Sequence, residues 1–586
     1  MTWYLQPMEQ LLSKQDTQLL NMIYEPTIVG VPLEDARRSL CVMPDGEIRS
    51  YGSIRKKHVH DLGEGAYLAS RDCGLSWKLY LNETVNVLGA SVRSPYSGKY
   101  ITLRSMNEGT EQGTYVYSSM KGPADASPTA RKITDEVLHD IFQPIALSSR
   151  ERWLCTMHRI QDGNYTPIVM TSDDDGDSWT IVSLPSTPRH EAVWPHLGLR
   201  WQNNGAEPVV TELPDGKLML LARTSLDYFY VYYSDDGGDH WTNGEPSNFH
   251  STLTTPFLLK MSDARNLLFW CNTRPLPEFH HESQWPPLHP DLISGRWEDV
   301  FTNRDACHAA ITADGTHWSG FRELYLSGLR NDADFRTKGG AISSNDKSVH
   351  QFQAIELPNG KILVALGQHE ISRRMIIFDV NWLYDSSRSE RFQAGLAHLS
   401  TQVFVKSVSG SSPSKGFTGH CAWNRTDGAL LVPDPDATHG EVLQLGRIRD
   451  PRLVSEVQGA VWNFPAAHHG ELTLEVRIAG SGVRLSLADH WIHPIDEHVT
   501  EYAAFSFTLT SEVLPPDEWC AIRIRFSEER IGWAQVFMED RPLFKVQQRC
   551  EAPFGLSYLH VQSLAVTEDP LGTYIRSIHY DSAPAQ

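Results

Sequence analysis

Side chains that can transfer protons stand together early in the chain. In the segment SIRKKHVHDLGEGAYL, Asp61 is preceded by His58 and His60. A carboxyl group acts as a general acid when its surroundings adjust its pKa, and an imidazole exchanges protons near neutral pH. The segment therefore contains the residue types that acid–base chemistry uses, and either histidine could be a proton carrier. The alternative is that both histidines are ordinary loop residues.

A second set of charged residues occurs in apolar, β-rich segments. Glu207 begins the central segment AEPVVTELPDG, where an unpaired carboxylate is costly to bury, so we expect a functional role for it. Arg223 lies in LMLLARTS and Arg304 in NRDACHAAIT. Planar guanidinium groups bind a carboxylate through two hydrogen bonds and stay charged. The alternative for each arginine is a surface position or an ordinary salt bridge.

The acidic balance of the chain limits its partners. The 586 residues carry a formal net charge of -20, which argues against nucleic acid and anionic membranes. An anionic substrate would therefore require a local basic cluster. No apolar run reaches the roughly 18 residues needed to span a bilayer. The start MTWYLQPMEQLLSKQDTQ lacks the pattern of a secretory signal, which predicts a cytoplasmic protein unless a signal has been removed.

Neither a metal nor a cofactor is expected from the spacing of the usual ligands. The eight cysteines are scattered without a CxxC pair, which indicates buried thiols. The His-rich segment FHHESQWPPLHPD, residues 279–291, matches no standard ligand spacing and is interpreted as a long loop at the rim of a site.

A repeated sequence motif indicates which elements position these side chains. SRDCGLSW (70–77), SDDDGDSW (172–179) and SDDGGDHW (234–241) share the pattern Ser-x-Asp-x-Gly-x-x-Trp, and TADGTHW (312–318) is a shortened copy. Asp and Ser/Thr can form hydrogen bonds within a hairpin loop, Gly supplies a special backbone angle, and Trp packs between neighbouring sheets. We interpret these boxes as fasteners between sheets, without a catalytic role.

The boxes occur among sequence patterns that are typical of β-hairpins. Apolar segments flank Pro-Asp/Asn-Gly turns in CVMPDGEI, TELPDGKL and IELPNGKI, and such turns are typical of tight hairpins. Counting these hairpin patterns between about residues 30 and 385 predicts roughly six four-stranded sheets. The expected fold is therefore an all-β, six-bladed β-propeller. Short alternating strands without boxes follow, which predicts a C-terminal β-sandwich. The expected domains are 1–390 and 391–586, with DSSRSERF (385–392) between them.

The boxes, the hairpin order and the charged positions together resemble the sialidase (neuraminidase) superfamily over roughly residues 30 to 385. Sialidases hold a substrate carboxylate with three arginines from different blades. The resemblance implies Arg37 or Arg38 as the first, Arg223 as the second and Arg304 as the third. The family's Arg-Ile-Pro motif is incomplete here, so Arg37 and Arg38 stay alternatives. The C-terminal region resembles concanavalin-like or laminin-G-like sandwiches in pattern only.

The same resemblance assigns further roles. Asp61 would be the general acid, preceded by a substrate-facing Arg55; Glu207 would be the base to the nucleophile, and Glu370 would hold the first arginine. The chain departs from the family at the nucleophile. Sialidases use a tyrosine shortly before the last Pro-Asp/Asn-Gly turn, and SVHQFQAIELPNG has Gln351 at that place, next to His350. A glutamine cannot replace a phenolate; Tyr228 or Tyr230 would have to come from elsewhere.

Three functions are compatible with this pattern. The first is an exo-acting glycosidase for a terminal acidic sugar, with a water or His350 replacing the tyrosine. The second is a lyase on a uronic acid, in which histidines such as His60, His350 or His369 act as acid and base. The third is a glycan-binding propeller without catalysis. All three take an acidic glycan as partner, and the oligomeric state stays open.

Overall fold

The computed structural model of the chain describes most of the 586 residues. The described residues are 3–33, 39–54, 64–81, 91–107, 111–123, 125, 127–191, 193, 203–276, 304, 306–327, 349–367, 372–404, 425–438, 440–451, 453, 455–528 and 532–582.

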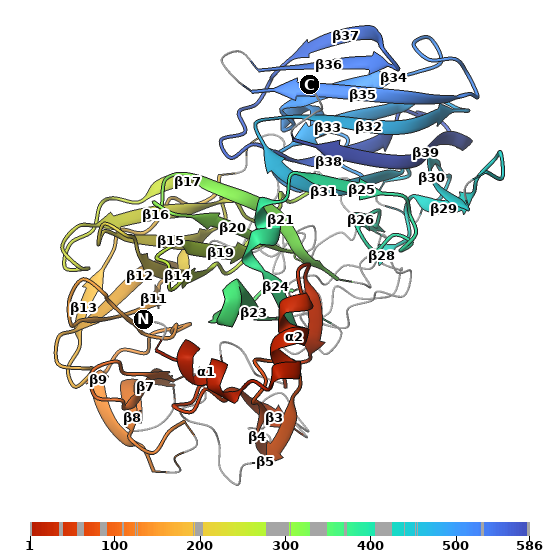
Figure 1. The fold of residues 1–586 in the computed structure, drawn as a ribbon. Coiled ribbons are helices and arrows are strands. Elements are labelled where there is room, and N and C mark those ends of the chain that lie inside the picture. The colour runs from red at the N-terminus through yellow and green to blue at the C-terminus, as the bar shows by residue number, and fades with distance from the viewer. Residues whose placement is uncertain are drawn as a thin grey trace.

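The described residues of the N-terminal domain form six four-stranded antiparallel sheets (Figure 1), which confirms the predicted propeller. In chain order from blade 1 to blade 5 the strands are β2 (Leu40–Val42), β3 (Ile48–Ile54), β4 (Glu64–Ser70) and β5 (Lys78–Leu81); β6 (Val92–Arg93), β7 (Tyr100–Met106), β8 (Gly113–Ser119) and β9 (Thr129–Thr134); β10 (Ile145–Ala146), β11 (Trp153–Gln161), β12 (Asn164–Ser172) and β13 (Thr180–Ser183); β14 (Asn204–Glu212), β15 (Leu218–Thr224), β16 (Tyr228–Ser234) and β17 (Glu245–His250); and β18 (Phe257–Lys260), β19 (Asn266–Trp270), β20 (Ala306–Thr312) and β21 (Trp318–Leu326).

Blade 6 combines the two ends of the propeller sequence. Its strands β22 (Gln353–Leu357), β23 (Lys361–Leu366) and β24 (Arg374–Asp379) are followed in the sheet by β1 (Thr27–Gly30). Strand β1 pairs antiparallel with β24, with Thr27 opposite Ile377. The helices α1 (Leu5–Leu11) and α2 (Lys14–Met22) precede β1, and α1 packs against β22. The ring is thus closed by hydrogen bonds between residues from opposite ends of the domain.

The repeated boxes lie between the third and fourth strands of their blades and contain the expected hydrogen bonds. In blade 3, Ser172 Oγ donates to Asp174 Oδ1 at 2.8 Å and accepts from the Gly176 amide at 2.8 Å. Asp174 also accepts from the Ser178 amide, and Trp179 Nε1 donates to the Gly176 carbonyl. The corresponding glycines all have a positive φ: Gly74 (87°), Gly176 (82°), Gly238 (97°) and Gly315 (78°).

Each box contacts the preceding blade, as expected for a motif that joins neighbouring sheets. A Cβ on Gly176 would lie 3.0 Å from Ile101 of blade 2, and one on Gly315 would lie 2.6 Å from Leu213 of blade 4. The box of blade 1 closes the ring, since Gly74 faces Leu363 of blade 6. Blade 2 has no Trp box, yet Ser119 Oγ donates to Asp125 in the same loop position.

The C-terminal domain is a β-sandwich, as predicted. One sheet has the order β29 (Leu430–Pro433), β30 (Glu441–Arg447), β39 (Asp569–Asp581), β32 (His469–Ile478), β35 (Trp519–Ser527), β36 (Trp533–Met538) and β37 (Arg541–Gln547), with β25 (Ser387–Glu390) paired to β39. The other has the order β26 (Leu399–Ser400), β31 (Gly459–Ala467), β38 (Leu556–Ser563), β33 (Val483–Ala488) and β34 (Phe505–Leu509). The remaining elements are the pair β27 (Val403–Phe404) and β28 (Arg425–Thr426), and the short helices η5 (Pro358–Gly360), η6 (Val380–Tyr384) and η7 (Val499–Glu501).

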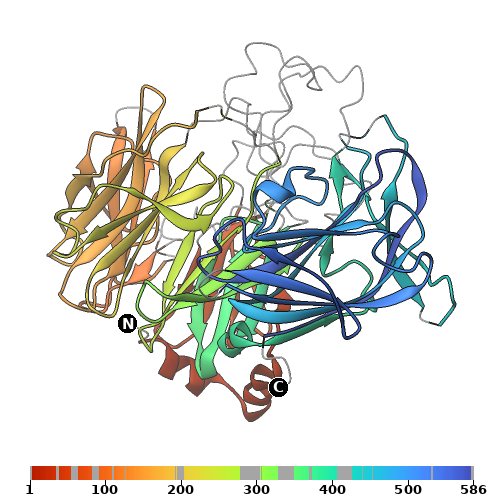
Figure 2. The same cartoon turned by 90° about the horizontal axis from the view of Figure 1, so that it is seen from above.

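The sandwich lies beside the propeller, where β31 contacts β21 (Figures 1 and 2). The interface combines apolar and polar contacts. Phe554 stacks on Phe249 and Phe321, with ring centroids 5.0 and 4.8 Å apart. Tyr558 donates to Glu323 Oε1 at 2.8 Å and also contacts His308 Nε2. The two domains therefore share a buried, hydrogen-bonded contact.

The described cysteines fit the interpretation as structural thiols. Cys41, Cys73, Cys155, Cys271, Cys307 and Cys520 are buried free thiols, and Cys550 is half-buried. Within the described part of the chain, no helix is long and apolar enough to cross a membrane.

Candidate functional site

Blades 4, 5 and 6 bring a polar cluster together at or near the start of their first strands. Thr255 Oγ1 donates a hydrogen bond of 2.6 Å to Glu207 Oε2, and Arg223 Nη1 contacts the same oxygen. Gln351 Nε2 lies 3.3 Å from Glu207 Oε1 and 3.4 Å from Thr255 Oγ1. Three blades thus hold one buried carboxylate: blade 4 through Glu207 and Arg223, blade 5 through Thr255 and blade 6 through Gln351.

The backbone is unusual at two of these residues. Glu207 has φ 43° and Gln351 has φ 71°, the left-handed region that non-glycine residues rarely occupy. Glu207 also lies where the pairing of β14 with β15 shifts between Ala206 and Val209. A β-bulge re-aims a side chain, and strained backbone persists where the surrounding structure fixes it. The two local distortions turn both side chains toward each other.

His158 forms a hydrogen bond with the distorted backbone at Glu207. The Glu207 amide donates to His158 Nδ1 at 3.2 Å, so this nitrogen carries a lone pair and the proton sits on Nε2. Nε2 lies 3.7 Å from Asp140 Oδ2. Burial lowers the pKa of His158 to about 4, although the nearby carboxylates of Asp140 and Glu207 act to raise it. His158 is therefore neutral at pH 7 and can accept the Glu207 amide hydrogen.

Two further predicted residues lie on adjoining segments. Arg304 is fully buried, and its carbonyl accepts a 2.7 Å hydrogen bond from the Val349 amide, directly before His350 and Gln351. His350 is buried as well, and its carbonyl accepts from the Gly367 amide. The chain before β20 is thus tied to the chain before β22, which carries the glutamine of the cluster.

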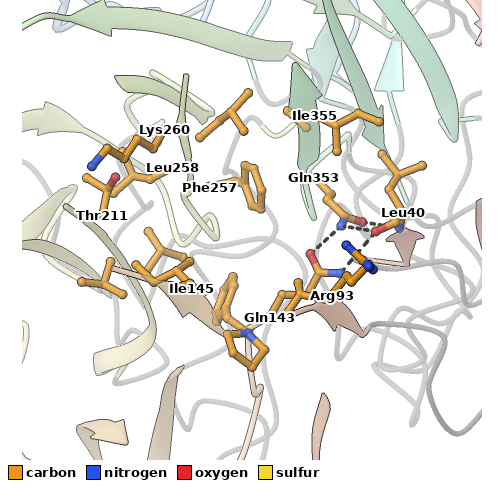
Figure 3. A pocket seen from close by; sticks show the side chains of 18 of the residues that line it. Leu40, Arg93, Gln143, Ile145, Thr211, Phe257, Leu258, Lys260, Gln353 and Ile355 are labelled. Carbon is orange, nitrogen blue, oxygen red and sulfur yellow. Dashed lines mark hydrogen bonds between the residues drawn. The ribbon is translucent and has the colours of Figure 1, made fainter. Parts of the chain in front are cut away.

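A cavity with a volume of about 260 Å³ is lined by residues from the first strand of every blade (Figure 3). Val209, Phe257 and Gln353 line it, and each stands two residues after a member of the cluster in the sequence. Gln353 Nε2 donates to Gln143 Oε1 at 2.6 Å and to the Leu40 carbonyl at 3.0 Å. Trp3 and Tyr4, before α1, also line the cavity.

Several predicted site residues lie outside the described residues. These are Arg37, Arg38, Arg55, His58, His60, Asp61, His369 and Glu370. Their roles stay predictions. Tyr228 and Tyr230, considered as substitutes for the missing tyrosine, belong to the apolar cluster that includes Leu147 and Leu220, between blades 3 and 4.

Thr255 and His158 were not predicted from the sequence as site residues. Thr255 stands two residues before β18, the same position that Gln351 has before β22. A comparison of the residues that directly precede the first strand of each blade would have suggested Thr255. His158 lies in the second strand of blade 3, and no local pattern around it indicates a contact with Glu207.

Comparisons with known proteins agree with the repeat pattern. Residues 105–332 match the family described as BNR repeat-like domain. No curated protein matches the chain. Among solved structures, the chain is similar to Trypanosoma rangeli sialidase in complex with sialic acid, with 12% identity over 95% of this chain and 92% of that chain, at a TM-score of 0.35.

Two bacterial structures give similar values. The NanB sialidase from Streptococcus pneumoniae shows 13% identity over 63% of this chain and 73% of that chain, at a TM-score of 0.36. The intramolecular trans-sialidase from Ruminococcus gnavus shows 12% identity over 62% and 95%, at 0.37. Because these TM-scores are low, the assignment depends on the chain's own sheets and the repeat match. The chain forms a β-propeller of four-stranded sheets, and part of that propeller matches the BNR repeat-like domain.

Proposed function

We propose that the protein is a glycoside hydrolase that releases a terminal sugar carrying a carboxylate, and that the polar cluster around Glu207 is its catalytic centre. The observation that supports this most is the buried carboxylate of Glu207, held by Arg223 and Thr255 on a distorted backbone. Burying a carboxylate is costly and strained backbone adds to the cost, so a purely structural origin is disfavoured.

The two oxygens of Glu207 have different surroundings. Oε2 contacts Arg223 and accepts the short hydrogen bond from Thr255, whereas Oε1 has the longer contact of 3.3 Å with Gln351. Hydrogen bonds to the ionised form favour it. We therefore assign Oε1 as the atom that accepts a proton during the reaction, while Oε2 fixes the orientation of the carboxylate.

Gln351 determines the type of displacement. An amide cannot form the covalent intermediate that a tyrosine forms, so we propose that a water molecule attacks the anomeric carbon directly. Glu207 takes the proton of that water, and Asp61 donates a proton to the leaving oxygen. Arg223, Arg304 and either Arg37 or Arg38 would bind the sugar carboxylate. A single displacement predicts inversion at the anomeric carbon.

The test is product analysis with sialosides and glucuronide-containing oligosaccharides. We expect a free acidic sugar that has gained one water, with inverted configuration in early NMR spectra. Glu207→Gln is expected to lower kcat by at least a factor of about 100, while His240→Gln, in an exposed box, serves as control. A product without added water and with new ultraviolet absorbance would replace the hydrolase with a lyase. Binding without turnover, lost in Arg223→Ala, would leave a glycan-binding propeller.

A further inference from the structure

A cluster of metal-binding groups lies at the contact between the two domains, away from the catalytic centre proposed above. His250 ends the outer strand β17 of blade 4, and Asp489 and His490 follow β33 of the sandwich. Ligand atoms of the three residues all lie within 4.8 Å of one another. Asp489 Oδ1 is 2.6 Å from His490 Nδ1 and 3.8 Å from His250 Nε2.

The burial of these groups distinguishes the cluster from ordinary surface pairs. Asp489 and His490 are 7% and 2% exposed, and the side chain of His250 is 28% exposed. The two imidazoles stack with ring centroids 3.8 Å apart. His490 Nε2 is buried and has no hydrogen-bond partner among the residues that the structure describes. A buried polar atom without a partner is rare and requires an explanation.

The loop that carries Asp489 and His490 is held firmly against the propeller. The Asp489 carbonyl accepts from Asn272 Nδ2 at 2.9 Å and from Ser557 Oγ at 3.2 Å. The Trp491 amide donates to the Asn272 carbonyl, and the Arg274 amide donates to the Trp491 carbonyl. The backbone of the two ligating residues is therefore fixed before any ion binds, which lowers the entropic cost of binding.

We propose that His250, Asp489 and His490 form a binding site for a transition-metal ion of the Zn²⁺ class, which links the propeller to the sandwich. Two imidazoles and one carboxylate are a ligand set that Zn²⁺ accepts, with a fourth position left for water. Zn²⁺ binds nitrogen at about 2.0–2.1 Å, so the ligand atoms of a tetrahedral site lie about 3.3 Å apart. The half-exposed His250 ring can make this small adjustment.

The positive charge of Arg274 acts on His250, His490 and Asp489 and opposes a cation at this place. The guanidinium lies 3.8 Å from the centre of the Tyr502 ring, which offers it a favourable cation–π contact. We therefore expect an affinity below that of a structural zinc finger. The ion would stabilise the domain contact without taking part in the reaction at Glu207.

The test uses the 586-residue protein, freed of metal with a chelator and then dialysed. Isothermal titration with ZnCl₂ is expected to show one site, and Zn²⁺ is expected to raise Tm by roughly 2 °C or more at saturation. Co²⁺ in place of Zn²⁺ is expected to give the visible absorption of a four-coordinate ion. Asp489→Asn and His490→Ala are expected to abolish all three signals.

The control must be a histidine paired with a carboxylate elsewhere, because the chain has 25 histidines and exposed ones offer weak metal sites. His240 Nδ1 lies 2.6 Å from Asp236 Oδ2, and its side chain is 90% exposed. His240→Ala is therefore expected to leave the site unchanged. If the interface variants do not fold, His250→Gln and the Co²⁺ spectrum of the unaltered protein decide the matter. Absence of a saturable site in the unaltered protein, or equal binding by His250→Gln, would overturn the proposal.

Discussion

The hydroxyl of Thr255 donates to the same Glu207 oxygen that Arg223 contacts, so one carboxylate oxygen receives donors from two blades. This leaves the second oxygen to face Gln351. The arrangement makes the relative position of blades 4, 5 and 6 a determinant of the geometry at Glu207, and Thr255 is a positioning residue in the proposed mechanism.

Replacing Thr255 by valine keeps its shape and removes this donor. Because the hydrogen bond stabilises the ionised carboxylate, kcat/KM at neutral pH is expected to fall roughly 10- to 100-fold. The acid limb of the pH profile is expected to move to higher pH, since the pKa of Glu207 rises when a donor is lost. Thr254→Val is the matched control, because Thr254 Oγ1 bonds to Ser251. A lower rate with an unchanged pH profile would contradict the positioning role.

Two equivalent glutamates in blades 4 and 6 are expected to respond differently to neutralisation. Glu212 accepts from Ser148 and Ser149 of blade 3 and from Lys260 of blade 5. Burial acts to raise its pKa, but these donors outweigh it and lower the pKa to about 2. The Glu356 carboxylate accepts from the amide and the hydroxyl of Ser262, and burial raises its pKa.

Glu212→Gln is therefore expected to lower the free energy of unfolding by about 3 kcal/mol, and Glu356→Gln to change it by less than about 1 kcal/mol. Chemical denaturation at pH 7 measures both. Equal losses in the two variants would show that the charge of Glu212 does not contribute to the contact between blades.

Stability is expected to fall as the pH decreases from about 6.5 to 4. Burial lowers the pKa of His158 to about 4 and that of His308 to about 3. Because these folded-state values lie below the unfolded value, the unfolded chain binds more protons in this range and is favoured. Glu212 adds a further loss only below about pH 4.5. Denaturation curves at pH 7.5, 6.5, 5.5 and 4.5 test the expectation, and His158→Gln should reduce the slope. Constant stability down to pH 4.5 would contradict it.

The fastening role of the boxes can be tested with glycines. Gly315 has φ 78°, and an added Cβ would lie 2.6 Å from Leu213 of the preceding blade. Gly163 has a similar φ of 72° and nothing within 4 Å. Gly163→Ala is expected to cost about 1 kcal/mol through backbone strain alone, and Gly315→Ala about 1–3 kcal/mol more through overpacking. Calorimetry compares the two variants. Equal Tm values would show that the Leu213 side chain moves aside without a loss of stability.

Local patterns made much of this fold predictable. The boxes were recognisable because their hydrogen bonds join residues two to four positions apart, such as Ser172 with Asp174. The place of β1 was not predictable, because Thr27 pairs with Ile377 and neither segment has a pattern that specifies its partner. For the site, Glu207 and Arg223 stood out as charges in apolar strands. Thr255 and His158 did not, because a single hydroxyl or imidazole acquires its role only when blades meet.

The pairing of β1 with β24 has a consequence for how the protein is made. Residues 27–30 leave the ribosome early, but their sheet partner is complete only after Asp379 has been synthesised. Strand β1 therefore stays unpaired while some 350 further residues emerge, and the propeller stays open until its last blade is made, which exposes the edges of the neighbouring blades. A nascent chain arrested before residue 374 should remain sensitive to protease, and one extended beyond the exit tunnel past residue 379 should become resistant in a single step.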